Sequence, residues 1–192
     1  MSEFNRQKSL IIYNTFMILG GPMNKYVIAT SSTSDLPAEY LKEHNIPFIS
    51  YTYTIDDKVY IDDCTEESRK FLMSSMRAGK QPNTSQITEY AYYEFLKEIL
   101  EAGNDVLFVD MTRALSSSIN NAERAIKSLS EEFPDRKISL LDSYCVTGGL
   151  ALFLKQLVKR HEEGWDYDQV VEWEMHISLN TFTVSWLKTY NG

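Results

Sequence analysis

The stretch VLFVDMTRALSSS, residues 106–118, joins an apolar run to a turn rich in hydroxyl groups. A nearly continuous apolar run is typical of a strand covered on both faces, as strands in parallel sheets are. The segment that follows, 119–133, has apolar residues at helical spacing and is closed by Pro134. The stretch therefore predicts a strand, a turn and a helix in that order, which is the repeating unit of a parallel α/β sheet.

The same order recurs on both sides of this stretch. The expected elements are strands over 26–29 and 137–142, a hairpin within 46–61, and helices over 38–43, 65–76, 88–101, 150–163 and 167–177. We therefore predict an α/β fold with a mostly parallel sheet flanked by helices. Right-handed crossovers would place the loops 30–35, 112–118 and 142–148 at one edge of that sheet, where ligands of such folds bind.

Size and charge limit what the chain can do. With 192 residues it has room for one domain and little more. The formal net charge of −8 argues against binding to nucleic acid or to an acidic membrane surface. Cys64 and Cys145 lie far apart, and the three histidines show no metal-ligand spacing. We expect a cytoplasmic chain with reduced thiols, no metal and no cofactor.

The ends of the chain set the expected domain boundaries. Residues 1–22 include an apolar stretch that is too short to span a bilayer, so we expect no stable membrane insertion. We interpret 1–22 as an N-terminal extension that is disordered or a non-native start. The α/β domain is expected over 23–164, and 165–192 as the start of a second domain that breaks off, with a strand at 181–184.

Two hydroxyl-rich segments stand before helices and are the candidate binding site. Hydroxyls and free backbone N–H groups at a helix start form a receptor for an anion. Two such turns converging above one sheet would bind a small acidic head group. The candidate ligand-binding residues are Thr84, Ser85, Ser116, Ser117 and Ser118, with Ser32 from the first loop.

Other interpretations of these serines stay open. Serines before helices often only cap them, and hydroxyl turns also hold phosphates or sugars in α/β modules. A surface used only for interaction is a further possibility. A serine hydrolase is disfavoured because there is no G-x-S-x-G turn and no histidine in the strand-edge loops. We therefore assign no catalytic residue.

Four segments together resemble one known family. They are TSSTSDLP at 30–37 (family pattern T-D-S-T-x-D-L-P), TSQ at 84–86 (T-S-Q-P), LSSSINNA at 115–122 (L-S-G-T-Y-x-x-A), and LDS at 141–143 with GG at 148–149 (D-S-x-x-x-x-G-x-G). Each match alone is weak, but their order and spacing over about residues 25–165 form a specific set. In these segments the chain resembles the DegV family of bacterial fatty-acid-binding proteins.

The resemblance implies a fold, a ligand and a partner. The family (EDD) fold has two α/β domains with an acyl chain between them, so this chain resembles a truncated member whose second domain is incomplete. A truncated, non-functional member of the family is the alternative. Thr84 and Ser116 would hydrogen-bond the carboxylate of a long-chain fatty acid. The protein would present that carboxyl to a separate ATP-using fatty-acid kinase and would have no catalytic activity alone. Ser31, Ile87 and Ser117 depart from the family's Asp, Pro and Gly.

Overall fold

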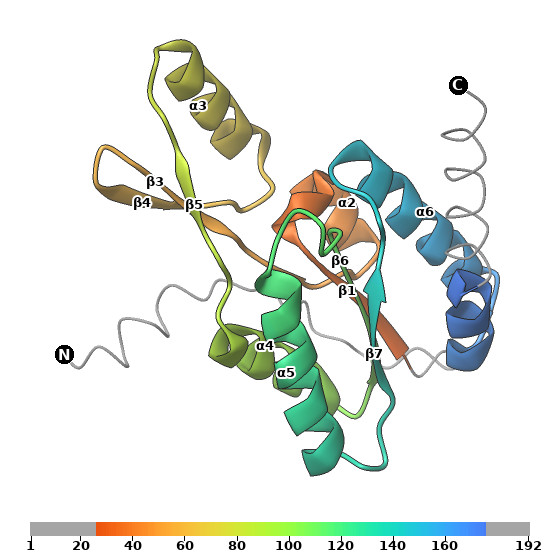
Figure 1. The fold of residues 1–192 in the computed structure, drawn as a ribbon. Helices are drawn as coiled ribbons and strands as arrows, with labels where there is room; N and C mark the ends of the chain where they lie inside the picture. The colour runs from red at the N-terminus through yellow and green to blue at the C-terminus, as the bar shows by residue number, and fades with distance from the viewer. Residues whose placement is uncertain (1–25, 176–192) are drawn as a thin grey trace, which may run out of the picture.

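A four-stranded parallel sheet forms the centre of the computed structural model, which describes residues 26–175 (Figure 1). Its strand order is β2-β1-β6-β7. The strands are β1 (Tyr26–Ser31), β2 (Phe48–Ile49), β6 (Asp105–Asp110) and β7 (Ile138–Asp142). All three neighbouring pairs are parallel. The predicted α/β fold with a mainly parallel sheet is confirmed.

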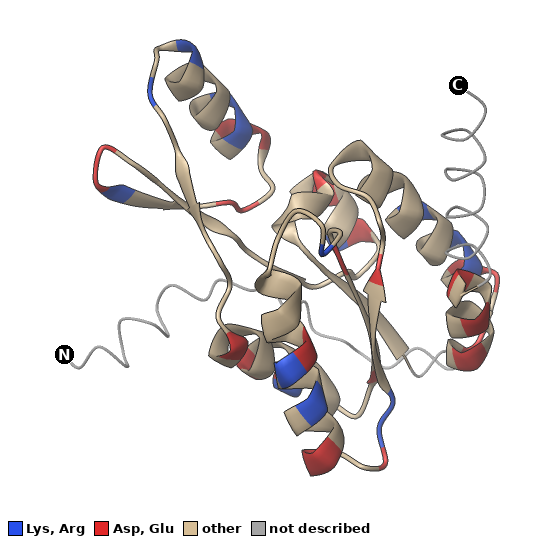
Figure 2. Cartoon of the chain, in the orientation of Figure 1, with Lys and Arg blue, Asp and Glu red and all other residues tan. Residues whose placement is uncertain are grey.

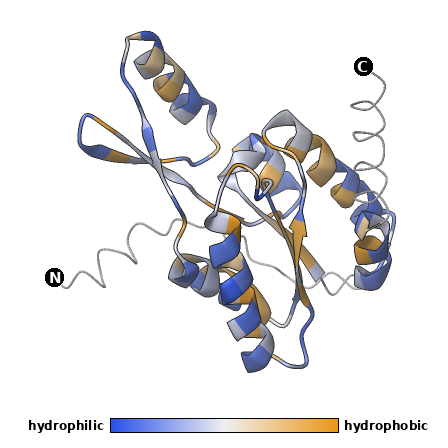
Figure 3. Cartoon of the chain, viewed as in Figure 1, coloured by the Kyte–Doolittle hydropathy of each residue, from blue (hydrophilic) through white to orange (hydrophobic). Residues whose placement is uncertain are grey.

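Helices cover both faces of this sheet. They are α4 (Glu89–Glu101) and α5 (Ser118–Glu132) on one face, and α2 (Ala38–Glu43) and α6 (Gly148–Glu162) on the other. Side chains alternate along β6, so that Val106 and Phe108 pack under α4 and α5 while Leu107 and Val109 pack under α6. All four are 0% exposed. Hydrophobic residues accordingly follow β7 and the inner sides of α5 and α6 (Figure 3).

A smaller antiparallel sheet projects from this body. Its strands are β3 (Thr52–Ile55), β4 (Lys58–Ile61) and β5 (Asn83–Ser85), in the order β4-β3-β5. Helix α3 (Glu66–Arg77) connects β4 to β5. We call residues 52–85 the arm, because they extend away from the parallel sheet (Figure 1). The predicted hairpin and the helix after it are confirmed.

The expectation of a helix-start turn around Thr84 is wrong. Thr84 lies in strand β5, where it pairs with Tyr53 of β3. Helix α4 starts after Thr88, whose side chain accepts a hydrogen bond from Ala91 N at 3.2 Å. Short polar residues resemble a turn locally, but here their backbone groups complete the free edge of a hairpin. Thr84 is therefore a strand residue, and Thr88, not Thr84, is the residue at the start of the helix.

The remaining expectations concern the two ends of the chain. The helix expected from Tyr167 is present through residue 175. Residues 1–22 and the strand expected at 181–184 lie outside the described residues. Within 26–175, no helix has the length and apolar character needed to cross a membrane.

Candidate functional site

A pocket of about 560 Å³ lies where the arm meets the carboxyl ends of the parallel strands. Its walls come from the loops after β1, β6 and β7, from β3 and β5, and from α3. The lining residues used below are Thr84, Ser85, Gln86, Ser116, Ser117, Tyr51, Tyr53, Asp35, Asp62, Leu72, Met111, Leu115, Val146 and Thr147. The two hydroxyl-rich segments of the sequence thus face one cavity, Thr84 from the arm and Ser116 from the body.

The Ser116 hydroxyl is held by its own loop and by Tyr51, which directly precedes β3. Ser116 Oγ accepts a hydrogen bond from Ser118 N at 3.2 Å. It also lies 3.5 Å from the Tyr51 hydroxyl oxygen. The loop precedes α5, a helix of 15 residues, so the predicted hydroxyl turn at a helix start is confirmed on this side. Ser116 can therefore meet a ligand close to a helix N-terminus, where negative charge is favoured.

The two hydroxyl segments are also tied to each other. Gln86 Nε2 donates to Ser117 Oγ. Ile87 N donates to Ser118 Oγ at 3.2 Å, and Asn121 Nδ2 donates to Ile87 O at 2.7 Å. Ser117, which stands where the family pattern has Gly, thus contacts Gln86, the residue that directly follows the arm. These bonds fix the distance between β5 and the start of α5.

The Thr84 hydroxyl is available to a ligand. Thr84 and its neighbour Ser85 are exposed along β5. Within the described part of the chain, neither side chain forms a hydrogen bond of its own. A hydroxyl in this condition can donate to a bound acceptor without first losing an internal partner.

Two of the predicted residues lie behind the pocket wall. Ser118 is 0% exposed and Ser32 is 1% exposed, and neither lines the pocket. The Ser118 hydroxyl accepts from Ile87 N, and the Ser32 hydroxyl accepts from Tyr51 N at 3.1 Å. The structure thus places these serines where they support the wall through buried backbone groups.

Sequence reasoning missed several lining residues. Tyr51 and Tyr53 were recognised only as part of an alternating strand, and that alternation is the signal that could have placed both on one face. Asp35 is part of the first hydroxyl motif and was not singled out. Asp62 follows the hairpin with no local pattern to mark it, because its place in the wall depends on how the arm folds back.

The charged groups of the wall are acidic. Asp35 and Asp62 line the pocket, whereas none of its lining residues within 26–175 is Lys or Arg. Burial raises the pKa of the Asp62 carboxyl, and the hydrogen bond from Cys64 N opposes this rise. Arg113, from the same loop as Ser116, instead pairs with Asp142 at 3.1 Å and Glu123 at 2.7 Å. Lys and Arg residues lie on α3, α5 and α6 (Figure 2).

A buried carboxylate lies beneath the site. Asp110, at the end of β6, is 0% exposed and accepts hydrogen bonds from Ser31 Oγ at 2.7 Å and Met111 N at 2.8 Å. The Tyr92 hydroxyl donates to its other oxygen at 2.8 Å. Burial raises the pKa of Asp110, and these donors act in the opposite direction. Across residues 26–175, no group of three or more His, Cys, Asp and Glu side chains is arranged to hold a metal.

Comparison with protein families gives one match. The model described as "Uncharacterised protein, DegV family" matches residues 25–190. A DegV domain-containing protein of Clostridium perfringens is 29% identical over 152 residues, which are 79% of this chain and 52% of the relative. A DegV domain-containing 15.5 kDa protein of Staphylococcus aureus is 31% identical over 137 residues, which are 71% of this chain and 94% of the relative. Apart from such a short relative, the chain spans about half the length of the curated relatives it matches first.

Solved structures show the same fold. A stearic acid-binding protein from Eubacterium ventriosum has a TM-score of 0.68 and 26% identity, and the match covers 77% of this chain and 51% of that protein. The fatty acid kinase (Fak) B3 protein of Streptococcus pneumoniae, loaded with linoleic acid, has a TM-score of 0.62 and 22% identity over 79% of this chain and 53% of that protein. The chain belongs to the DegV family.

Proposed function

We propose that this chain binds a long-chain fatty acid whose carboxylate is held by the hydroxyls of Thr84 and Ser116. The observation that carries the proposal is that Thr84, in β5, and Ser116, in the loop between β6 and α5, line the same pocket. The similar protein from Eubacterium ventriosum binds stearic acid and shares the fold. Ser85 and Ser117 stand beside the two hydroxyls and complete the proposed polar end, with Ser118 and Ser32 behind it.

Hydroxyl donors suit a carboxylate that must leave water. Such a group costs several kcal/mol to bury unless new hydrogen bonds replace those to water. A hydrogen bond to a charged acceptor returns about 1.5–3 kcal/mol. Thr84 and Ser116 can each supply one. Backbone N–H groups at the start of α5 add a favourable dipole on the Ser116 side.

The other side of the pocket suits an acyl chain. Leu72, Met111, Leu115 and Val146 line it with aliphatic groups. Leu115 is 69% exposed and is therefore able to gain buried area when a tail lies against it. Each buried CH₂ contributes about 0.8 kcal/mol. In this arrangement the acyl tail supplies most of the affinity, and the hydroxyls of Thr84 and Ser116 supply the selectivity for a carboxylate head group.

The partner we propose is a separate fatty-acid kinase in the cytoplasm. The hydroxyls that hold the carboxylate are neutral, and no Lys or Arg is among the lining residues described. One carboxylate oxygen therefore stays free to accept a phosphoryl group from the kinase. In this proposal the chain presents the carboxyl and carries out no chemistry itself. Because the chain spans about half the length of most of its curated relatives, the activity of the whole protein is part of the same proposal.

A phosphate or sugar phosphate fits the pocket less well. Asp35 and Asp62 both line it, and a dianionic phosphate would be repelled more strongly than a single carboxylate. A protonated or singly charged acid meets less opposition. The electrostatics of the wall thus favour the fatty acid over the phosphate alternative.

Native mass spectrometry of the 192-residue chain, purified from a bacterial host, tests the proposal. We expect an added mass equal to a fatty acid, which is released and identified under denaturing conditions. The variant carrying both Thr84→Ala and Ser116→Ala should retain much less of it. Ser130→Ala, an exposed serine on α5, is the matched control and should bind like the wild type. A copurified ligand that contains phosphorus would contradict the proposal. So would a double variant that retains as much fatty acid as the wild type.

A further inference from the structure

The hydrogen of the Ser116 hydroxyl determines whether this residue can bind a carboxylate. A serine oxygen has two acceptor positions and one hydrogen to donate. Ser118 N already donates to one acceptor position at 3.2 Å. If a second donor fills the other position, the Ser116 hydrogen has no internal acceptor and is free to point into the pocket.

The Tyr51 hydroxyl is the group placed to be that second donor. Tyr51 is 8% exposed, and its oxygen lies 3.5 Å from Ser116 Oγ. This separation is at the long end for two hydroxyls, and a small movement of either side chain brings them into ordinary hydrogen-bond range. Burial raises the pKa of the Tyr51 phenol, so the group keeps its hydrogen at neutral pH.

The surroundings of Tyr51 favour donation toward Ser116. The hydroxyls of Ser118 and Tyr92 are also among the groups that affect the pKa of the Tyr51 phenol. The Ser118 oxygen accepts from Ile87 N, which leaves the Ser118 hydrogen to donate to Tyr51. The Tyr92 hydrogen is committed to the buried carboxylate of Asp110 at 2.8 Å.

Donors therefore line up in one direction through the wall. Ile87 N donates to Ser118, Ser118 can donate to Tyr51, and Tyr51 can donate to Ser116. We propose that Tyr51 is a positioning residue of the carboxylate site, whose hydroxyl donates to Ser116 and turns the Ser116 hydrogen toward the ligand. This inference rests on the proposed function, and it adds a residue that fixes the head-group preference.

A change of one oxygen atom tests the inference. Tyr51→Phe keeps the ring in the wall and removes only the hydroxyl. We expect affinity for palmitic acid to fall about tenfold, the size of one hydrogen bond to a charged group. Affinity for hexadecanol should fall much less, because a neutral head group depends less on an ordered donor. A merely structural effect would weaken both ligands equally.

Tyr26→Phe is the matched control. Tyr26 stands at the start of β1, at the opposite end of the sheet, and its buried hydroxyl donates to Trp165 O at 3.1 Å. This variant loses the same group and should keep the wild-type ratio of acid to alcohol affinity. If Tyr51→Phe keeps that ratio or binds the acid more tightly, the inference is overturned while the proposed function stands. A wild-type chain that binds no acyl ligand overturns both.

A second measurement needs no variant. In wild-type protein labelled with ¹³C at the tyrosine Cζ atom, the Tyr51 resonance should move when palmitic acid binds, because its hydrogen bond to Ser116 shortens. Hexadecanol should move it less. A Tyr51 resonance that responds equally to the two ligands would overturn the inference.

Discussion

The body and the arm of this molecule each combine a β-sheet with helical structure, yet they bury their apolar residues very differently. In the body, β1 is buried at every position and Phe108 of β6 is 0% exposed. In the arm, all three residues of β5 are exposed, and Met73 and Met76 of α3 are 51% and 48% exposed. The body therefore has a large closed core, whereas the arm buries only a few apolar side chains, such as Tyr53 and Ile55.

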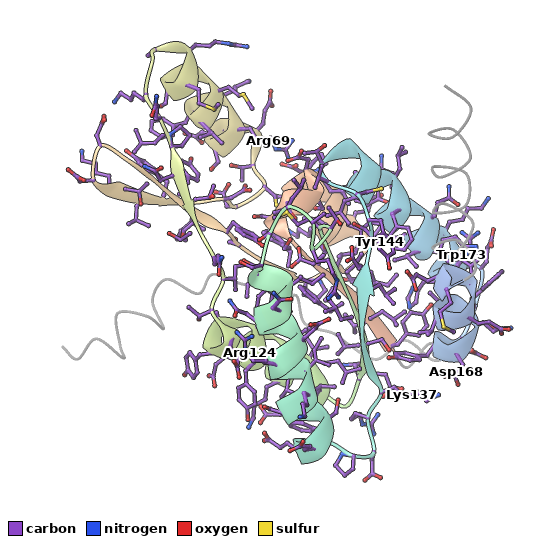
Figure 4. All side chains as sticks on the ribbon, in the orientation of Figure 1. Arg69, Arg124, Lys137, Tyr144, Asp168 and Trp173 are labelled. Atoms are coloured by element: carbon purple, nitrogen blue, oxygen red, sulfur yellow. The ribbon has the colours of Figure 1, made fainter. Side chains whose placement is uncertain are left out.

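The difference matters because the candidate site needs both regions. Ser116 comes from the body and Thr84 from the arm. Arg69 is one attachment between them, since its guanidinium donates to Leu36 O at 3.0 Å and to Cys64 O at 2.8 Å. Figure 4 labels Arg69 near the base of α3. Stability should thus be set mainly by the body, and the geometry of the head-group site by how the arm is held.

The largest expected effect is on stability. Phe108 packs against the rings of Tyr92 and Phe95, with centroids 5.5 Å and 6.3 Å away. Phe108→Ala should lower the free energy of unfolding by about 3–5 kcal/mol, because it leaves a cavity in a closed core. Phe71→Ala on α3, where the ring is 40% exposed, should lower it by less than about 1.5 kcal/mol. Urea unfolding measures both, and equal losses would refute the contrast between body and arm.

A smaller effect is expected at the attachment of the arm. Arg69→Met keeps the aliphatic stem but leaves two carbonyl groups without their charged donor, which should cost about 1–3 kcal/mol locally. Hydrogen exchange should then quicken in α3 and β5 while β1 and β6 stay protected. Arg124→Met, which removes an exposed ion pair with Glu89, is the control. Uniformly faster exchange throughout the molecule would argue against a separately held arm.

The smallest effect concerns pH. Because the pKa of Asp62 is raised, this carboxyl takes up a proton at a higher pH than an ordinary Asp and removes a negative charge from the pocket. Affinity for a fatty acid carboxylate should therefore rise as pH falls through that range. Asp62→Asn should raise the affinity for the fatty acid at pH 7 by about fivefold. It should also reduce the dependence of that affinity on pH in this range.

The same raised pKa has a consequence for stability. The folded chain holds the Asp62 proton more tightly than the unfolded chain, so the contribution of this group is greatest at low pH and is lost as pH rises through the raised value. Asp57→Asn, in the exposed β3–β4 turn, is the control for both measurements. An Asp62→Asn variant that keeps the wild-type pH profile of binding would show that this carboxyl does not face the ligand.

Sequence reasoning predicted the body well because its signals are local. The apolar run of β6 and the helical spacing of α5 were sufficient, and the predicted helix 38–43 has the bounds of α2. The segment Asn83–Ser85 was predicted wrongly because it forms a strand only by pairing with β3, which is distant in the sequence. Its polar residues carry no local pattern that indicates this pairing. Asp62 was missed for the same reason: it becomes a pocket residue only when the arm folds against the sheet edge.

The most direct test of the account is the ¹³C NMR spectrum of palmitic acid labelled at its carboxyl carbon and bound to this chain. We expect one bound carboxyl resonance, distinct from that of free acid, which shifts in Thr84→Ala and again in Ser116→Ala. That result would show both hydroxyls at one carboxyl group. A bound resonance that neither substitution moves would contradict the account.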